Sequence, residues 1–164
     1  MKISVITSEK KLKYIQGDLI KEAKKGTFDT IIHGANCRNV MGAGIAYHIA
    51  KNFPEALEAD TKYYRNNLDF RGSFSFAFVD DKQQFVGDQL MIINAYTQYD
   101  PGPYASYDAI QSVFSKLNRS LFMETRRIGI PKIGCGIGGL EWPIVELIID
   151  TYAPDLNITC VEFV

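Results

Sequence analysis

The chain has 164 residues, of which 46% are hydrophobic and 23% charged, proportions typical of one soluble globular domain with a substantial core. Its formal net charge of −1 gives no basic field, which argues against general binding of nucleic acid or anionic membranes. Three widely separated cysteines, Cys37, Cys135 and Cys160, argue against a disulfide framework and against the paired ligand spacing of a zinc site. Because no apolar segment suits a leader or a membrane span, we expect a cytoplasmic protein without a bound metal.

The first half of the chain is predicted to alternate short strands with short helices. Apolar runs bounded by polar residues indicate strands at residues 3–7, 12–16 and 30–32. Gly17 and Asp18 close the second of these strands, and a helix at 19–25 is expected to stop at Gly26. A small-residue helix at 45–50 is ended by Pro54, which lies near the first turn of a helix reaching residues 63 and 64.

The second half continues the alternation. Phe74, Phe76 and Phe78 alternate with small residues, which predicts a half-buried strand whose three phenylalanines belong to the core. The later elements are an interior strand at 89–96, an amphipathic helix at 110–121, a strand at 127–132, a helix at 140–150 and a strand at 157–164. Strands that alternate with helices predict an α/β fold, a three-layer α/β/α sandwich around a central mixed sheet, formed here by a single domain over residues 1–164.

Two glycine-rich turns each connect a predicted strand to a predicted helix. The first spans residues 34–44 and the second residues 133–139. Such turns suit phosphate groups, because backbone N–H groups converge, glycine allows close approach and the helix N-terminus adds partial positive charge. The alternative is a tight βα turn that needs small residues for packing. Both turns, Gly17-Asp18 and the loop after Asn94 follow strand ends, where α/β sheets bind ligands, and this favours one pocket for a ligand with two phosphates.

Several segments taken together resemble the macrodomain family. They are GD at 17–18, HGANC at 33–37, MGAGIA at 41–46, FP at 53–54, IINAYTQ at 92–98 and IPKIGCGIGGLEW at 130–142. The resemblance covers essentially the whole chain in order, and it is closest to the bacterial and phage branch and to ADP-ribose 1″-phosphate phosphatase-like members. It implies the macrodomain fold, a pocket for ADP-ribose and no cofactor.

The resemblance also implies which residues bind ADP-ribose. Asp18 matches the acidic residue that accepts from the adenine amino group, with a helix N-cap as the alternative role. Asn36 matches an asparagine facing the distal ribose, where its amide can donate to one hydroxyl and accept from another, or it is a polar turn residue. The other implied ligand-binding residues are Leu19, Ala35, Met41, Gly42, Ala43, Gly44, Ile45, Asn94, Ala95, Tyr96, Ile133, Gly134, Cys135, Gly136, Ile137 and Gly138.

Three residues near these turns allow more than one interpretation. Tyr96 could stack on a base or a ribose, or it could be a pocket wall or core residue. Lys132 could bind a phosphate, or it could be a solvated lysine at a strand end. Cys135 is interpreted as a small loop residue rather than a nucleophile, because no partner base is apparent.

The resemblance gives a mixed indication for catalysis. One hydrolase branch of the family carries an aspartate after the first glycine turn, where this chain has Ala46, and another uses a lysine and an aspartate at positions occupied here by Ala95 and Gly138. Those two mechanisms are therefore not expected. His33 matches a histidine of the phosphatase-like members, and His33 and Asn36 are the candidate catalytic residues. A near-neutral imidazole could relay a proton or activate water, whereas the alternative is a buried strand histidine.

Two functions from different classes remain open. The first is an enzyme that removes the phosphate from ADP-ribose 1″-phosphate or hydrolyses another ADP-ribosyl linkage. The second is a non-catalytic module that binds ADP-ribose or ADP-ribosylated targets. The expected partners are ADP-ribose or a derivative, including an ADP-ribosylated protein or nucleic acid; no membrane contact is expected, and we expect a monomer.

Overall fold

The computed structural model of the protein describes residues 12–66, 68–80 and 89–164. Its strands are β1 (Lys13–Gly17), β2 (Thr30–Asn36), β3 (Phe74–Phe78), β4 (Met91–Gln98), β5 (Arg127–Ile130) and β6 (Asn157–Phe163). Its helices are α1 (Leu19–Lys24), α2 (Gly44–Asn52), α3 (Pro54–Tyr63), α4 (Tyr107–Asn118), α5 (Leu121–Glu124) and α6 (Trp142–Tyr152). The strand expected at residues 3–7 lies outside the described residues.

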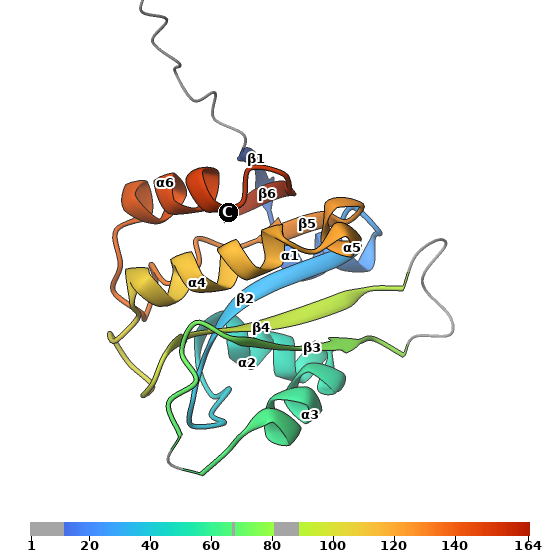
Figure 1. Cartoon of the computed structure of the whole chain (residues 1–164). Coiled ribbons are helices and arrows are strands. Elements are labelled where there is room, and N and C mark those ends of the chain that lie inside the picture. Colours follow the sequence, from blue (N-terminus) through green and yellow to red (C-terminus); the bar gives the residue numbers. More distant parts are fainter. Residues whose placement is uncertain (1–11, 67, 81–88) are drawn as a thin grey trace, which may run out of the picture.

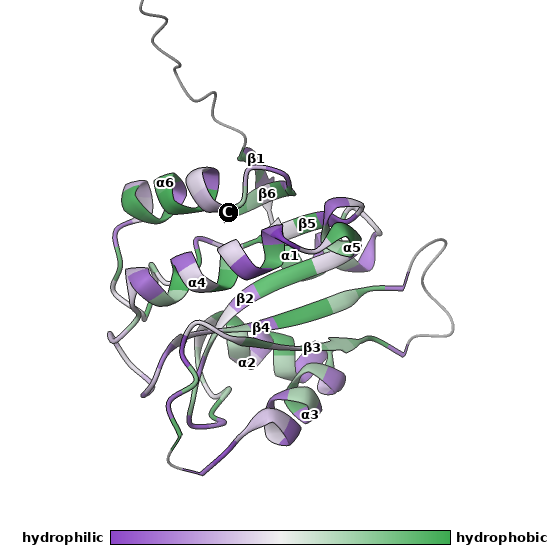
Figure 2. Cartoon of the chain, viewed as in Figure 1, coloured by the Kyte–Doolittle hydropathy of each residue, from purple (hydrophilic) through white to green (hydrophobic). Residues whose placement is uncertain are grey.

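The strands form a single mixed sheet in the order β1-β6-β5-β2-β4-β3 (Figure 1). Every neighbouring pair is parallel except β3 and β4, which are antiparallel. The central strands β2 and β4 are hydrophobic along most of their length, as Figure 2 shows, and both are buried on their two faces. Continuous apolar strands of this kind are expected where helices cover both sides of a parallel sheet.

Helices cover both faces of the sheet, which confirms the predicted three-layer α/β/α sandwich. Successive side chains of a strand point to opposite faces. Ile31 therefore packs in a core cluster with residues of α1, α2 and α3, whereas Ile32 packs in a second cluster with residues of α4, α5 and α6. In α4 the buried residues recur at helical spacing, as the amphipathic pattern predicted.

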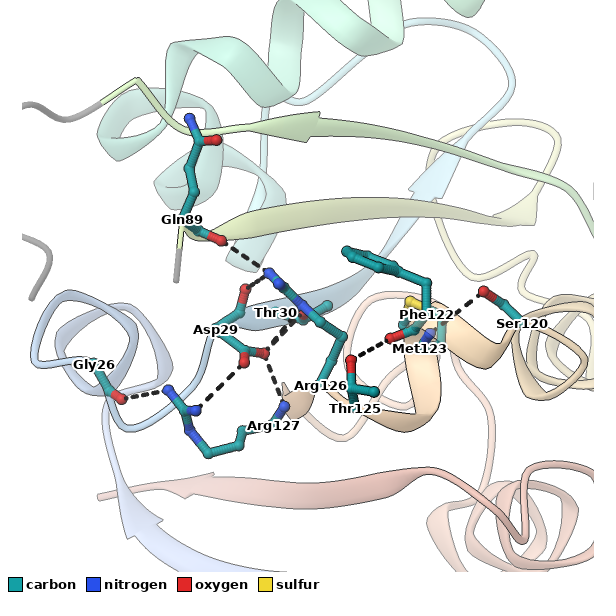
Figure 3. Close-up of polar contacts among 10 residues, drawn as sticks. All are labelled: Gly26, Asp29, Thr30, Gln89, Ser120, Phe122, Met123, Thr125, Arg126 and Arg127. Carbon is teal, nitrogen blue, oxygen red and sulfur yellow. Dashed lines mark hydrogen bonds and ion pairs between the residues drawn. The ribbon is translucent and has the colours of Figure 1, made fainter. Parts of the chain in front are cut away.

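A buried ionic cluster fixes the amino-terminal ends of the central strands (Figure 3). Asp29 is 2% exposed, and its Oδ1 accepts a hydrogen bond from the Arg127 backbone N–H at 2.8 Å. The Arg126 guanidinium donates to the carbonyl oxygens of Asp29 and Gln89 and to the Thr30 hydroxyl at 2.7–2.9 Å. Because each charge has partners, the cluster can be buried without a large desolvation penalty. It lies at the end of the sheet where β2 and β4 begin, opposite the end at which they finish.

The structure corrects three sequence-based predictions about the strands. Phe76 and Phe78 are 53% and 39% exposed, so the phenylalanine stripe of β3 is not wholly core; only Phe74 packs against the cluster under α4. The interior strand predicted to end at residue 96 continues to Gln98, and the strand predicted at 30–32 continues to Asn36. The described helices include none long and apolar enough to cross a membrane.

Candidate functional site

A cavity of about 610 Å³ opens at the carboxyl ends of β2, β4 and β5. Both glycine-rich turns contribute to its wall, as the sequence predicted. The predicted residues that line it are Ala35, Asn36, Gly42, Ala43, Gly44, Ile45, Ile133, Gly134, Gly136, Ile137 and Gly138. The lining also includes Gly34, Val40, Ala46, Thr97, Gln98, Pro101, Gly102, Pro131 and Lys132.

Asn36 ends β2 and shapes the first glycine-rich turn. Its Nδ2 donates to the Val40 carbonyl oxygen at 2.7 Å, and its Oδ1 accepts from the backbone N–H groups of Arg38 and Val40 at 3.0 and 3.3 Å. The two acceptor positions of Oδ1 are therefore occupied by the turn itself, and one Nδ2–H remains. Asn36 can donate to a bound hydroxyl but cannot also accept from one, so the expected dual role is reduced to donation.

The N-terminus of α2 forms one wall of the cavity. Gly44, Ile45 and Ala46 are its first three residues and all line the cavity, while Ala43 at the N-cap provides no side-chain hydrogen bond. The first N–H groups of a helix have no partner within the helix, so this turn presents free donors and a positive dipole end. Gly44 has φ +59°, which favours glycine, and a Cβ atom there would lie 3.2 Å from Ile137 Cδ1. The two glycine-rich turns thus approach each other across the cavity.

The second turn is closed by its own backbone. The Leu140 N–H donates to the Gly134 carbonyl oxygen at 2.9 Å, and the Cys135 N–H donates to the Lys132 carbonyl oxygen at 3.1 Å. A Cβ atom on Gly138 would lie 2.7 Å from the Gly134 oxygen, so the turn in this form accepts only glycine there. Among the described residues that line the cavity, Lys132 alone carries a charged side chain, and it is exposed.

The Cys135 side chain does not line the cavity, and the expected place of Cys135 among the ligand-binding residues stays a prediction. Its thiol donates to the Ile133 carbonyl oxygen at 3.4 Å and packs against the core cluster under α4. Burial raises the pKa of the Cys135 thiol to about 11. A thiol that stays protonated at neutral pH is a poor nucleophile, in agreement with the interpretation of Cys135 as a loop residue.

Asp18 adopts the alternative role considered from the sequence. Its Oδ1 accepts from the backbone N–H groups of Ile20 and Lys21 at 3.0 and 3.1 Å, and it is the N-cap of α1. Its side chain is not part of the cavity wall. Leu19 and Met41, also expected at the ligand, are 5% and 7% exposed, and their side chains belong to the core cluster under α1–α3; their contact with the ligand stays a prediction.

Asn94, Ala95 and Tyr96 lie too deep in the sheet to line the cavity, and their expected contact with the ligand stays a prediction. All three are fully buried. β4 continues for two residues beyond Tyr96, so Thr97 and Gln98, not Tyr96, form its carboxyl end. The Tyr96 ring stacks on Tyr63 at 5.2 Å between ring centroids, and its hydroxyl donates to Asp60 Oδ1 at 2.8 Å. Of the two interpretations of Tyr96, the structure therefore supports the core residue.

His33 is fully buried and likewise does not line the cavity. Asn94 uses both amide hydrogens, donating to the Ala56 carbonyl oxygen at 2.9 Å and to Ser75 Oγ at 3.1 Å. The 2.6 Å contact between His33 Nε2 and Asn94 Oδ1 is therefore a bond in which His33 donates. Burial lowers the pKa of His33 to about 4, so the imidazole is neutral at pH 7. These features favour the buried strand histidine over a proton relay.

Four of the missed lining residues, Thr97, Gln98, Pro101 and Gly102, come from the end of β4 and the loop that follows it. Thr97 and Gln98 end β4, and Gln98 Nε2 donates to the carbonyl oxygens of Asp100 and Gly102 at 2.8 and 2.9 Å, which folds the following loop against the cavity. A strand predicted to end at residue 98 would have placed them at the site. The proline and glycine content of residues 101–103 predicts a loop, but it does not predict that this loop folds back against the cavity.

Comparisons with known proteins give a consistent result. A family model described as Macro domain matches residues 32–149. The chain is 36% identical over 157 residues to an uncharacterized 17.5 kDa protein of Enterobacteria phage T4, covering 93% of this chain and 96% of that protein. It is 26% identical to the ADP-ribose 1″-phosphate phosphatase of Lodderomyces elongisporus, covering 92% and 99% of the two chains.

Two further similarities involve only part of a longer protein. A DNA ADP-ribosyl glycohydrolase of Mycobacterium tuberculosis is 31% identical over 138 residues, covering 81% of this chain and 36% of that protein. The structure of Thermosipho africanus DarTG in complex with ADP-ribose has a TM-score of 0.74 and 21% identity, covering 97% of this chain and 43% of that chain.

Proposed function

This chain belongs to the Macro domain family, and we propose that it binds ADP-ribose in the cavity between the two glycine-rich turns and hydrolyses an ADP-ribose derivative there. The observation that carries the proposal is the pairing of the uncapped N-terminus of α2 with the closed second turn across one cavity. The free N–H donors of α2 and the glycine backbone of the second turn face one space, which suits a diphosphate. The similarity to a phosphatase and to a glycohydrolase that both act on ADP-ribose derivatives supports the same ligand.

The charges around the cavity agree with an anionic ligand. No described lining residue carries a carboxylate, and the exposed Lys132 ammonium stands at the rim of the second turn. A diphosphate would therefore meet N–H donors and one cation without an opposing negative charge. At the adenine end, both capping bonds of Asp18 use Oδ1, so Oδ2 can still accept from the adenine amino group. At the other end, the remaining Nδ2–H of Asn36 donates to a hydroxyl of the distal ribose.

The chemistry at the distal ribose would depend on positioning rather than on an acid–base side chain. The described lining contains no histidine, aspartate, glutamate or cysteine. Water attack on a 1″-phosphate or on an ADP-ribosyl linkage would then be assisted by the held orientation of the ribose and by the charge of Lys132 and the backbone donors. A proton relay through His33 stays a prediction, since it would require a path from a fully buried ring.

The same lining favours a second candidate, a module that binds ADP-ribose without turnover. Both candidates accept free ADP-ribose or an ADP-ribosylated protein or nucleic acid as the partner class. A reducing cytoplasm is the compartment we propose, because all three cysteines are free.

Calorimetry with ADP-ribose, followed by turnover assays, tests the proposal. We expect one-to-one binding in the micromolar range, about −8 kcal/mol, and weaker binding of AMP because it leaves one turn empty. Phosphate release from ADP-ribose 1″-phosphate and ADP-ribose release from modified DNA or protein then separate the enzyme from the reader. Lys132→Ala should weaken ADP-ribose binding, whereas Lys51→Ala, an exposed lysine of α2 outside the cavity wall, should not. Absence of binding at millimolar ADP-ribose would refute the proposal.

A further inference from the structure

The outer edge of β3 carries free backbone hydrogen-bonding groups. β3 is the last strand of the sheet, and no other strand of residues 12–66, 68–80 and 89–164 pairs with its outer edge (Figure 1). On the inner edge, the Tyr96 N–H donates to the Ser73 oxygen and the Val79 N–H to the Leu90 oxygen. Bonding residues alternate along an antiparallel pair, so the backbone groups of Phe74, Phe76 and Phe78 point outward.

This edge lacks the features that usually prevent strands from associating. Its five residues, FSFAF, include no charge and no proline, and the register with β4 runs without a bulge. Natural edge strands are commonly protected by one of these devices. The rings of Phe76 and Phe78 lie edge-to-face with 6.1 Å between their centroids, and the two residues are 53% and 39% exposed. Within the part of the chain that the structure describes, the edge therefore combines donors and acceptors that no strand pairs with and exposed aromatic rings.

We propose that this edge binds a second copy of the chain, with the two β3 strands antiparallel about a twofold axis at Phe76. Phe74 and Phe78 lie at equal distances from Phe76, with the small residues Ser75 and Ala77 between them. In this register Phe76 faces Phe76 of the other copy, and Phe74 faces Phe78. Each is a hydrogen-bonded pair that uses outward backbone groups, and all six rings lie on one face of the joined sheet. A twofold interface needs such self-complementarity.

The charges of α3 are complementary under the same twofold axis. A groove of about 520 Å³ runs between α3 and β3, and its lining includes Phe74, Phe76 and Phe78. Glu55 and Glu58 from the first half of α3, Lys62 from its last turn and Arg65, two residues beyond its end, also line this groove. A twofold axis reverses the direction of the neighbouring α3, so the acidic half of one helix meets the basic half of the other. This arrangement adds attraction and fixes the register.

The proposed dimer replaces the monomer expected from the sequence and is independent of the proposed function. The residues that line the groove and those that line the ADP-ribose cavity do not overlap. Sedimentation equilibrium on the full chain should show a mass approaching twice 18.5 kDa as the protein concentration rises. A mass of 18.5 kDa at all concentrations up to about 1 mM would overturn the proposal.

Engineered cysteines test the register. Phe76→Cys places two thiols opposite each other at the axis, where Cα atoms of a hydrogen-bonded pair lie about 5.5 Å apart, within reach of a disulfide. Phe78→Cys is the matched control, because its two copies would be about 14 Å apart, beyond that reach. Mild oxidation should therefore link Phe76→Cys into a covalent dimer and leave Phe78→Cys unlinked. Equal linkage of both variants, or of neither, would overturn the register.

Charge substitutions test the two contacts separately. Phe76→Lys should weaken dimerisation roughly tenfold or more, since a charge on an edge blocks strand association. Leu147→Lys, at a residue 62% exposed on α6, is the control and should leave the dimer unchanged. Glu58 and Lys62 already form an ion pair within α3 at 2.9 Å, so the test uses the other two charges of the groove: Glu55→Lys should weaken the dimer, and adding Arg65→Glu should restore it, because the charges are then reversed but complementary. An unaltered dimer in Phe76→Lys, or no recovery in the double variant, would contradict the proposed interface.

Discussion

The protonation of His33 should make the stability of the protein depend on pH in a predictable direction. Burial lowers the folded-state pKa of His33 to about 4, whereas an unfolded chain has a histidine pKa of about 6.5. Between these values the unfolded state binds more protons than the folded state. The contribution of His33 is therefore complete above pH 6.5 and is lost as the pH falls toward 4.

The magnitude follows from the two pKa values. Between pH 7 and pH 4.5, this single group should reduce the free energy of unfolding by about 2.5 kcal/mol. His33→Gln removes the titration but keeps an N–H that can donate to the Asn94 side chain. Burial raises the pKa of Asp60, which makes the folded state more stable as the pH falls, opposite to the effect of His33. Because both proteins share this contribution, the loss of unfolding free energy in the wild type must be compared with the loss in the variant.

Urea unfolding of wild type and His33→Gln at pH 7 and pH 4.5 measures this difference. The variant should lose about 2.5 kcal/mol less than the wild type between the two pH values. The imidazole signal of His33, compared with that of the exposed His48 as the second histidine of the chain, should titrate below pH 5. Equal losses in both proteins, together with titration near pH 6.5, would refute the buried neutral state. Turnover in His33→Gln then tests the proton relay directly.

The remaining predictions concern the cavity. Asp18→Ala should lower the free energy of unfolding by about 1 kcal/mol through loss of the N-cap and lower ADP-ribose affinity about tenfold; a change in melting temperature alone would exclude the adenine contact. Gly136→Val should fold normally, because a Cβ atom there meets nothing within 4 Å, yet bind ADP-ribose at least roughly tenfold more weakly. Gly44→Val should weaken both folding and binding, since its φ of +59° strains any other residue. Normal affinity in both glycine variants, measured by calorimetry, would exclude a diphosphate across the turns.

The layers and the glycine-rich turns could be predicted from the sequence because they depend on local signals. Apolar runs, helical spacing and glycine position decide whether a segment is a buried strand, an amphipathic helix or a strand-to-helix turn. Gly44 and Gly136 were placed at the cavity for this reason, and the structure locates both there. The residue at which a strand ends depends instead on its pairing with the neighbouring strand. β4 extends to Gln98 beside β2, and no local signal distinguishes residue 96 from residue 98 as the last paired residue.

Burial at the edge of the sheet also could not be predicted locally. Phe74, Phe76 and Phe78 have the same pattern, yet only Phe74 packs against the cluster beneath α4. Their difference arises from the position of β3 at the end of the strand order and from the extent of the helices over that edge. Both depend on contacts between distant parts of the chain, which periodicity within a strand does not report.

His33, Asn94 and Tyr96 do not line the cavity, but a chain of hydrogen bonds connects them to one another and to α3. The hydrogen bonds run in one direction, from His33 to Asn94, on to Ser75 and Tyr96, and finally to Asp60 in α3. The chain of bonds therefore ties β2, β4 and β3 to α3.

The residue after Asp60 extends this connection to the cavity. The Thr61 hydroxyl donates to Asn39 Oδ1 at 3.2 Å, and Asn39 lies in the first glycine-rich turn with φ 58°. Asn36, three residues along β2 from His33, holds the same turn through Val40. The first glycine-rich turn is thus held in place by β2, which precedes it, and by α3. A cavity formed mainly of backbone groups needs this support, because free N–H donors bind a phosphate well only if the turn that carries them is already in place.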